Sequence, residues 1–269
     1  MTFLELFKQD VAIAKNIPFG LEGEERLTLD IYAPPNAHGL PVTMWFYGGG
    51  WRSGDKRLFE HLGRAFAVRG IVAVAANYRL TPEVKYPTNA EDCAAATAWV
   101  YRNIGRYGGN PEALFVAGHS AGAHLAAMIA LDERFLEREG LSNSIIRGVV
   151  MVSGAADLAE YVHSSVFTAR EHIEETFGRD EVALRAASPI NWVSSDDPPF
   201  LVITAENDPP GLRKQGKALA EALRNVDVLA RYISVRGRDH FSIVRRFGSG
   251  DDTTANSAAE FIQRLTLRT

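Results

Sequence analysis

A serine between very small residues stands where an apolar run meets a helical pattern. The turn Gly118-His-Ser-Ala-Gly122 directly follows Leu114–Ala117 and leads into the alanine-rich stretch Ala121–Leu131. A serine on so tight a strand-to-helix turn is held in strained backbone geometry, which only small neighbours permit. The turn lifts the Ser120 hydroxyl above a sheet and places it at a helix amino end, where negative charge is stabilised. The pattern therefore predicts a nucleophilic serine; a serine that merely caps the helix is the alternative.

Short apolar runs alternate with longer helical patterns along the rest of the chain. This alternation predicts an α/β fold with a mostly parallel twisted sheet, flanked by helices on both faces. The run Leu27–Tyr32 alternates apolar and polar residues, which suits an exposed or edge strand. Further strands are expected at Val42–Tyr47, Ile71–Ala75, Leu114–Ala117, Val149–Val152, Phe200–Thr204 and Val228–Val235. Helices are expected at Leu58–Val68, Ala90–Asn103, Ala121–Leu131, Gly211–Leu223 and Thr254–Leu265.

The region from Asp157 to Pro198 breaks this alternation. It ends in Asp196-Asp-Pro-Pro199, a stiff return into the next strand. The aromatic residues of the region are Tyr161, Phe167, Phe177 and Trp192. An excursion of this length in a compact domain is usually a functional cover. We expect residues 1–269 to form a single domain with a lid-like insertion at about 157–198.

The partners of the serine are expected in two loops further along the chain. A serine hydroxyl is a weak nucleophile near neutral pH and needs a positioned base. In this kind of sheet an acid and then a histidine follow the serine, each after a strand. Asp208 lies in the exit loop of Phe200–Thr204, and His240 follows the last expected strand. We therefore expect a catalytic triad of Ser120, Asp208 and His240.

Other carboxylates and histidines are the alternatives for these roles. Glu206 in the same loop and Asp157 after the preceding strand are the other candidates for the acid, and Asp208 itself can be a turn-forming residue. Asp239 is too close in sequence to the histidine to reach its ring. His119 and His124 flank the serine, where packing or capping roles are expected. The remaining histidines, expected in solvent or in the cover, are His38, His61, His163 and His172.

A run of glycines follows the strand Val42–Tyr47. Consecutive glycines let the loop Tyr47-Gly-Gly-Gly-Trp51 bend so that neighbouring N–H groups converge on one point. In an acyl-transfer enzyme that point holds the oxygen of the tetrahedral intermediate. The N–H groups expected to form this oxyanion hole are those of Gly49, Gly50 and Ala121.

Composition and spacing exclude several other classes of site. The net charge of -4 without a block of like charges leaves no footprint for nucleic acid. A phosphate-binding loop would need lysine where Asp55 stands, and the dinucleotide motif would need glycine at Ser53. Cys93 is the single cysteine, which excludes an internal disulfide and a thiolate metal cluster. No metal or organic cofactor is therefore expected.

The amino terminus and the apolar runs indicate where in the cell the protein is expected. The first residues carry acids where a secretion signal needs bases, and no apolar run reaches membrane-spanning length. We expect a cytoplasmic protein that does not contact membranes. An exposed edge strand could also pair with that of a second copy, so a homodimer is a further possibility.

The motifs resemble those of the α/β hydrolases, in particular the hormone-sensitive-lipase-like esterases and the arylformamidase (kynurenine formamidase)-like branch. They are Tyr47–Trp51 with Ser53–Lys56, Asn77–Glu83, Gly118–Leu125, Asp208 and Asp239–Phe241, and the resemblance runs from about Glu25 to the carboxyl end. It implies the α/β-hydrolase fold, the same triad, and an oxyanion hole at Gly49 and Gly50. It also implies a carboxylesterase that cleaves a small-molecule ester or amide through an acyl-enzyme. N-formyl aryl amines such as N-formylkynurenine are the alternative substrates, and a non-catalytic ligand-binding relative is the other alternative.

Two residues depart from the pattern of the family. Tyr47 stands where the glycine loop usually begins with a histidine that braces it, and Asn77 stands where many relatives have aspartate. We expect the change at Tyr47 to affect the geometry of the loop without removing an N–H donor. Trp51 and Tyr78 are candidate residues of an apolar substrate pocket, although single aromatic residues are more often part of the core.

Overall fold

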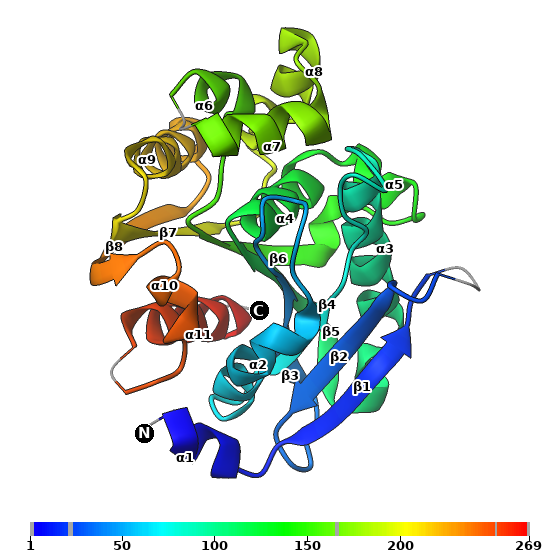
Figure 1. Ribbon diagram of the computed structural model, residues 1–269. Helices are drawn as coiled ribbons and strands as arrows, with labels where there is room; N and C mark the ends of the chain where they lie inside the picture. Colours follow the sequence, from blue (N-terminus) through cyan, green and yellow to red (C-terminus); the bar gives the residue numbers. More distant parts are fainter. Residues whose placement is uncertain (1–2, 21–23, 165–166, 251, 268–269) are drawn as a thin grey trace.

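The computed structural model is built around an eight-stranded sheet with the order β1-β2-β4-β3-β5-β6-β7-β8 (Figure 1). It describes residues 3–20, 24–164, 167–250 and 252–267. The pairs β1-β2 and β2-β4 are antiparallel. The strands β4, β3, β5, β6, β7 and β8 all run parallel to one another. The strands are β1 (Ala12–Pro18), β2 (Thr28–Ala33), β3 (Leu40–Phe46), β4 (Val72–Ala76), β5 (Gly109–His119), β6 (Ile146–Val152), β7 (Phe200–Asn207) and β8 (Ala230–Asp239).

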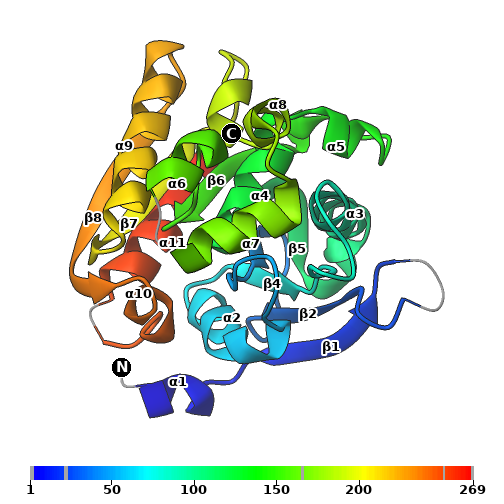
Figure 2. The same cartoon turned by 45° about the horizontal axis from the view of Figure 1, so that its top comes forward.

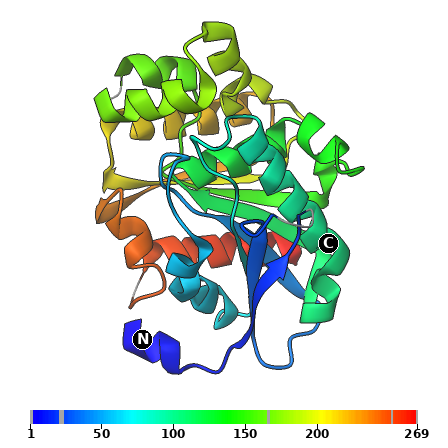
Figure 3. The same ribbon diagram turned by 45° about the vertical axis from the view of Figure 1, so that its right-hand side comes forward.

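Helices cover both faces of the sheet. On one face lie α3, α4 and α9, and on the other lie α2 and α11 (Figures 1 and 3). The α-helices are α1 (Phe3–Lys8), α2 (Glu60–Ala67), α3 (Thr88–Asn103), α4 (Ala121–Leu131), α5 (Arg134–Glu137), α6 (Leu158–Ser164), α7 (Phe167–Phe177), α8 (Glu181–Ala186), α9 (Pro210–Asn225), α10 (Ser242–Arg245) and α11 (Thr253–Thr266). The 3-10 helices are η1 (Lys56–Phe59), η2 (Ile104–Tyr107), η3 (Asn143–Ile145) and η4 (Pro189–Trp192).

Two apolar cores result from the alternation of side chains along each strand. In β3, Met44 and Phe46 are buried in the core beneath α3 and α4, whereas Trp45 is buried in the core on the opposite face. The ring of Trp45 packs there against Phe247, with 5.9 Å between the centroids. Nearly continuous apolar runs such as Val72–Ala76 are what a strand covered on both faces requires, and all of its residues are buried.

The fold class predicted from the sequence is confirmed, and each expected strand and helix is present, most of them with ends shifted by a few residues. One prediction about a strand was wrong. Leu27–Tyr32 was expected at an edge, but β2 lies between β1 and β4 and is buried in five of six positions. The edge position belongs to β1, which was not predicted because its sequence, AIAKNIP, mixes polar residues without a regular period.

The carboxyl ends of the parallel strands meet at one edge of the sheet, and the segment between β6 and β7 lies over this edge. The segment contains α6, α7, α8 and η4; α6 contacts α9, and η4 contacts both α4 and α9. Figure 2 shows α6 and α7 lying across this end of the molecule. Residues 165–166 and the side chain of Phe167, which the sequence placed in the expected lid, lie outside the described residues.

In the described part of the chain, no helix combines the length and the apolar character needed to cross a bilayer.

Candidate active site

Ser120 lies in the strained turn that its neighbours predict. It joins β5 to α4 with φ 52° and ψ −121°, a conformation that is unfavourable for a residue with a side chain. A Cβ atom at Gly118 would lie 2.4 Å from the carbonyl oxygen of Gly122, and one at Gly122 would lie 2.2 Å from that of Phe46. Both positions therefore require glycine, and the predicted strand–turn–helix is confirmed.

The structure brings together the hydroxyl of Ser120, the imidazole of His240 and the carboxylate of Asp208. Ser120 Oγ lies 3.0 Å from His240 Nε2, and His240 Nδ1 lies 2.8 Å from Asp208 Oδ1. The Asp208 side chain is fully buried, while 17% of the His240 side chain is exposed. With its Nδ1–H donated to Asp208, the neutral imidazole presents Nε2 as an acceptor for the serine proton.

Two further donors hold the carboxylate of Asp208. Its Oδ2 accepts from Ser153 Oγ at 2.5 Å and from the N–H of Ala205 at 2.7 Å. Burial raises the pKa of Asp208, but the hydrogen bonds from His240, Ser153 and Ala205 outweigh burial, so the pKa is lowered below its ordinary value. Asp208 is therefore an anion at neutral pH and can stabilise an imidazolium.

The other candidate acids have different partners. Glu206 accepts from the N–H of Gly237 at 2.9 Å, and Asp157 accepts from the N–H of Glu160 at 3.0 Å. Asp239 accepts from the two N–H groups that follow His240, each at 2.9 Å. In the described part of the chain, none of these carboxylates hydrogen-bonds the His240 ring.

The glycine loop lies directly against Ser120. A Cβ atom at Gly48 would lie 2.9 Å from Ser120 Cβ, so the backbone of the loop approaches the serine as closely as glycine allows. Gly49 and Gly50 have φ values of 142° and 60°, which favour glycine. Among the described residues, their N–H groups have no hydrogen-bond acceptor. The N–H of Ala121 opens α4, where the first turn leaves donors without an intrahelical acceptor.

Tyr47 connects this loop to Arg26 and Tyr78. Its buried hydroxyl accepts from Arg26 Nη2 at 2.7 Å, and its ring stacks on Tyr78 with 4.7 Å between the centroids. Arg26 also donates to the carbonyl oxygens of Tyr78 and Gly54. Burial raises the pKa of Tyr47 to about 12, so the phenol is neutral. Arg26 was missed in the sequence because it lies outside the motifs.

The two aromatic residues suggested for the substrate pocket are engaged with the protein itself. Tyr78 is fully buried, and its hydroxyl donates to the carbonyl oxygen of Tyr47 at 2.8 Å. Trp51 is 5% exposed, and its Nε1 donates to His124 Nδ1 at 3.3 Å. These contacts favour a role in bracing the loop over direct substrate contact.

Helix α7, in the segment between β6 and β7, contacts the glycine loop and Arg52, which directly follows it. Glu175 forms an ion pair with Arg52 at 2.9 Å. Phe177 packs edge-on against Trp51, with 4.9 Å between the centroids. The ring of His172 lies over Gly50, where a Cβ atom would be 2.7 Å from His172 Nδ1. The sequence placed His172 only in the expected cover, because its proximity to the loop depends on how α7 packs.

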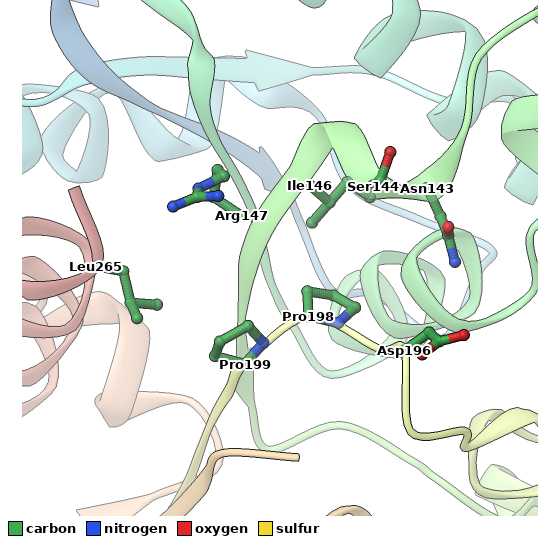
Figure 4. Close-up of a pocket in the computed structure, with 8 residues that line it drawn as sticks. All are labelled: Asn143, Ser144, Ile146, Arg147, Asp196, Pro198, Pro199 and Leu265. Atoms are coloured by element: carbon green, nitrogen blue, oxygen red, sulfur yellow. The ribbon is translucent and has the colours of Figure 1, made fainter. Parts of the chain in front are cut away.

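A separate cavity of about 260 Å³ lies far from these groups, at the amino ends of β6 and β7 (Figure 4). It is lined by Asn143, Ser144, Ile146, Arg147, Asp196, Pro198, Pro199 and Leu265. Since Ser120, Asp208 and His240 lie at the carboxyl ends of the strands, this cavity is not part of the candidate active site. Within the described ranges, no cluster of histidine, cysteine or carboxylate side chains is arranged to hold a metal ion.

Comparison with known proteins supports the same family. The family model BD-FAE matches residues 29–223. The chain is 33% identical to esterase LipQ of Mycobacterium tuberculosis over 80% of its own length and 53% of LipQ, so it spans about half of that relative. It is 30% identical to kynurenine formamidase of Salmo salar, over 88% of this chain and 77% of the formamidase.

Solved esterase structures have the same fold. Esterase B of Lactobacillus rhamnosis is similar with a TM-score of 0.84 at 21% identity, over 99% of this chain and 91% of the other. An esterase of Pyrobaculum calidifontis has a TM-score of 0.80 at 27% identity, over 99% of this chain and 88% of the other. The resemblance to the α/β-hydrolase esterases is thus confirmed, and the chain belongs to the BD-FAE family.

Proposed function

We propose that this chain is a carboxylesterase that cleaves small esters through an acyl-enzyme intermediate. The observation that carries the proposal is the continuous hydrogen-bonded path from Ser120 Oγ through His240 to Asp208. Such a path supplies a nucleophile, a base and a group that orients the base. The esterases among its relatives support the same reaction.

The first half of the reaction forms the acyl-enzyme. Ser120 Oγ attacks the ester carbonyl while His240 Nε2 accepts the hydroxyl proton. The imidazolium is stabilised by Asp208 and then gives its proton to the departing alcohol. In the second half, His240 activates a water that attacks the acyl-enzyme, and Ser120 leaves with the proton. Atoms and charges balance without any further reactant.

The developing oxyanion is assigned to the N–H groups of Gly49, Gly50 and Ala121. The first two lack an acceptor in the described part of the chain, and the third begins a helix whose positive end faces the site. Donors fixed in advance favour the transition state over the substrate, and loss of one raises the barrier by about 3 kcal/mol.

We assign the segment from about residue 157 to 198 to a cover that forms part of the substrate site in a single-domain enzyme. The contacts of Phe177 and His172 with the glycine loop, and of Glu175 with Arg52 directly after it, support this assignment. A homodimer remains a prediction from the free edges of the sheet.

Hydrolysis of p-nitrophenyl acetate and p-nitrophenyl butyrate tests the proposal. The wild-type protein is expected to release p-nitrophenol, and Ser120→Ala to lower kcat to the background rate. Ser144→Ala is a matched control, because Ser144 is exposed at the cavity on the opposite end of the strands. Equal turnover by wild type and Ser120→Ala would rule the proposal out.

Hydrolysis of aryl formamides is the second candidate function. It is favoured by the match to kynurenine formamidase, which extends over 77% of that protein, compared with 53% of LipQ. The same three residues would attack the formyl carbon, with the arylamine as leaving group. A kcat/KM for N-formylkynurenine above that for p-nitrophenyl butyrate would favour the formamidase, and the reverse order would favour the esterase.

A further inference from the structure

Ser153 occupies an unusual position directly after β6. It is fully buried and has a φ of 49°, the left-handed region that residues with a side chain rarely adopt. Its N–H donates to the carbonyl oxygen of Ile203 at 2.7 Å, which ties it to β7. A non-glycine residue held in this conformation costs stability, and such strain concentrates at functional sites.

The strained backbone directs the Ser153 hydroxyl at Asp208. The hydroxyl donates to Oδ2 at 2.5 Å, and the N–H of Ala205 donates to the same oxygen. Oδ1 is therefore available to accept from His240 Nδ1, which lies 2.8 Å away. Each oxygen of the carboxylate thus has a separate task, and rotation about its Cβ–Cγ bond would break bonds on both sides.

The preceding residue connects the end of β6 to the nucleophile. The carbonyl oxygen of Val152 accepts from the N–H of Ser120 at 2.9 Å. Two consecutive residues therefore hold the backbone of the serine and the side chain of the acid. Ser120 and Ser153 both have positive φ, and they follow neighbouring parallel strands. The end of β6 is thus a shared support for both ends of the hydrogen-bonded path.

We propose that Ser153 is a positioning residue of the esterase, which fixes the Asp208 carboxylate so that Oδ1 orients the imidazole of His240. This inference rests on the function proposed above. Ser153 does not touch the substrate; it acts through Asp208. A supporting group of this kind narrows the range of orientations available to the base and so raises kcat more than it lowers KM.

The Ser153→Ala and Ser153→Gly variants test the inference together. Both lack the hydroxyl, but alanine keeps the strain of a positive φ, whereas glycine relieves it. Ser153→Gly is therefore expected to unfold at a higher temperature than Ser153→Ala. If Ser153 positions Asp208, both variants lose about tenfold in kcat with p-nitrophenyl butyrate, and KM is nearly unchanged.

A purely structural role for Ser153 predicts a different pattern. Activity would then follow stability, so Ser153→Gly would turn over faster than Ser153→Ala and close to the wild-type rate. That result, or an unchanged kcat in both variants, would overturn the inference. Failure of the proposed function would give a different result. The wild-type protein would then release no p-nitrophenol, or the Ser120→Ala variant would keep the full rate.

Discussion

His119 Nε2 donates to the carbonyl oxygen of His240 at 2.8 Å, so the residue before Ser120 holds the backbone of His240. The centroids of the two rings are 4.7 Å apart. Burial, followed by the nearby His240, lowers the pKa of His119 to about 3. His119 is therefore neutral at pH 7, and it serves as a hydrogen-bond donor that holds the loop of His240.

The stability of the protein is expected to fall between pH 6.5 and about pH 3. Burial lowers the pKa of His124 to about 4, and that of His119 to about 3, from the ordinary value of 6.5. Because the unfolded chain binds these protons more readily, the free energy of unfolding is retained above pH 6.5 and decreases as pH falls below it. Each histidine contributes up to about 1.4 kcal/mol per pH unit, measurable by urea denaturation.

A His124→Gln variant isolates one of these contributions. In the fold, His124 donates from Nε2 to the carbonyl oxygen of Ala187 and accepts at Nδ1 from Trp51, which requires the neutral ring. Wild type is expected to be more stable than the variant at pH 7, and the difference should shrink as pH falls. A difference that stays constant between pH 7 and pH 5 would contradict the assigned role of His124.

Gly50→Ala is expected to lower kcat by about a hundredfold, because one oxyanion donor is displaced. The added Cβ atom would lie 2.7 Å from His172 Nδ1, so the loop or α7 must move. Gly140→Ala is the matched control: its φ of 72° carries a similar backbone cost, and a Cβ atom there has no neighbour within 4 Å. Equal kcat values for both variants in an ester assay would show that the N–H of Gly50 does not stabilise the oxyanion.

Tyr47→Phe is expected to lower the free energy of unfolding by about 1–2 kcal/mol, because the part-buried Arg26–Tyr47 hydrogen bond is lost. Urea denaturation gives this value directly. Tyr101→Phe is the control, since its hydroxyl bonds Glu112 on the surface, where about 0.5 kcal/mol or less is expected. A Tyr47→Phe cost no larger than the control cost would show that the Arg26 network does not brace the loop.

Asp208→Asn is expected to lower kcat by about four orders of magnitude, because an amide stabilises the wrong tautomer of His240. Glu206→Gln changes the other carboxylate of the same loop, which bonds the N–H of Gly237 instead, and should keep the wild-type rate. Steady-state kinetics of both variants distinguish these acids. The assignment fails if the Glu206 variant is the one that loses activity.

Local sequence was sufficient to predict the features that local geometry determines. The turn at Gly118–Gly122 requires glycine for reasons of space, and α4 begins and ends at the predicted residues, Ala121 and Leu131. The fold class followed from the alternation of apolar runs and helical patterns. Asp208 and His240 could be selected because chain order in this fold limits the candidates.

Contacts between distant residues account for what was missed. Ser153 reaches Asp208 across 55 positions and Arg26 reaches Tyr47 across 21, and neither pair has a local pattern that indicates it. The contact of His172 with Gly50 depends on how α7 packs. β2 appeared to be an edge strand because its neighbour β1 has no clear period.

The central claim is that the Ser120 hydroxyl is the attacking nucleophile. Reaction with a fluorophosphonate, followed by mass spectrometry of the proteolysed protein, tests it most directly. The account predicts one phosphonylated peptide carrying the label on Ser120, loss of ester hydrolysis in proportion to labelling, and no labelling of Ser120→Ala. A wild-type protein that hydrolyses esters without labelling at Ser120, or a Ser120→Ala variant labelled to the same extent, would contradict it.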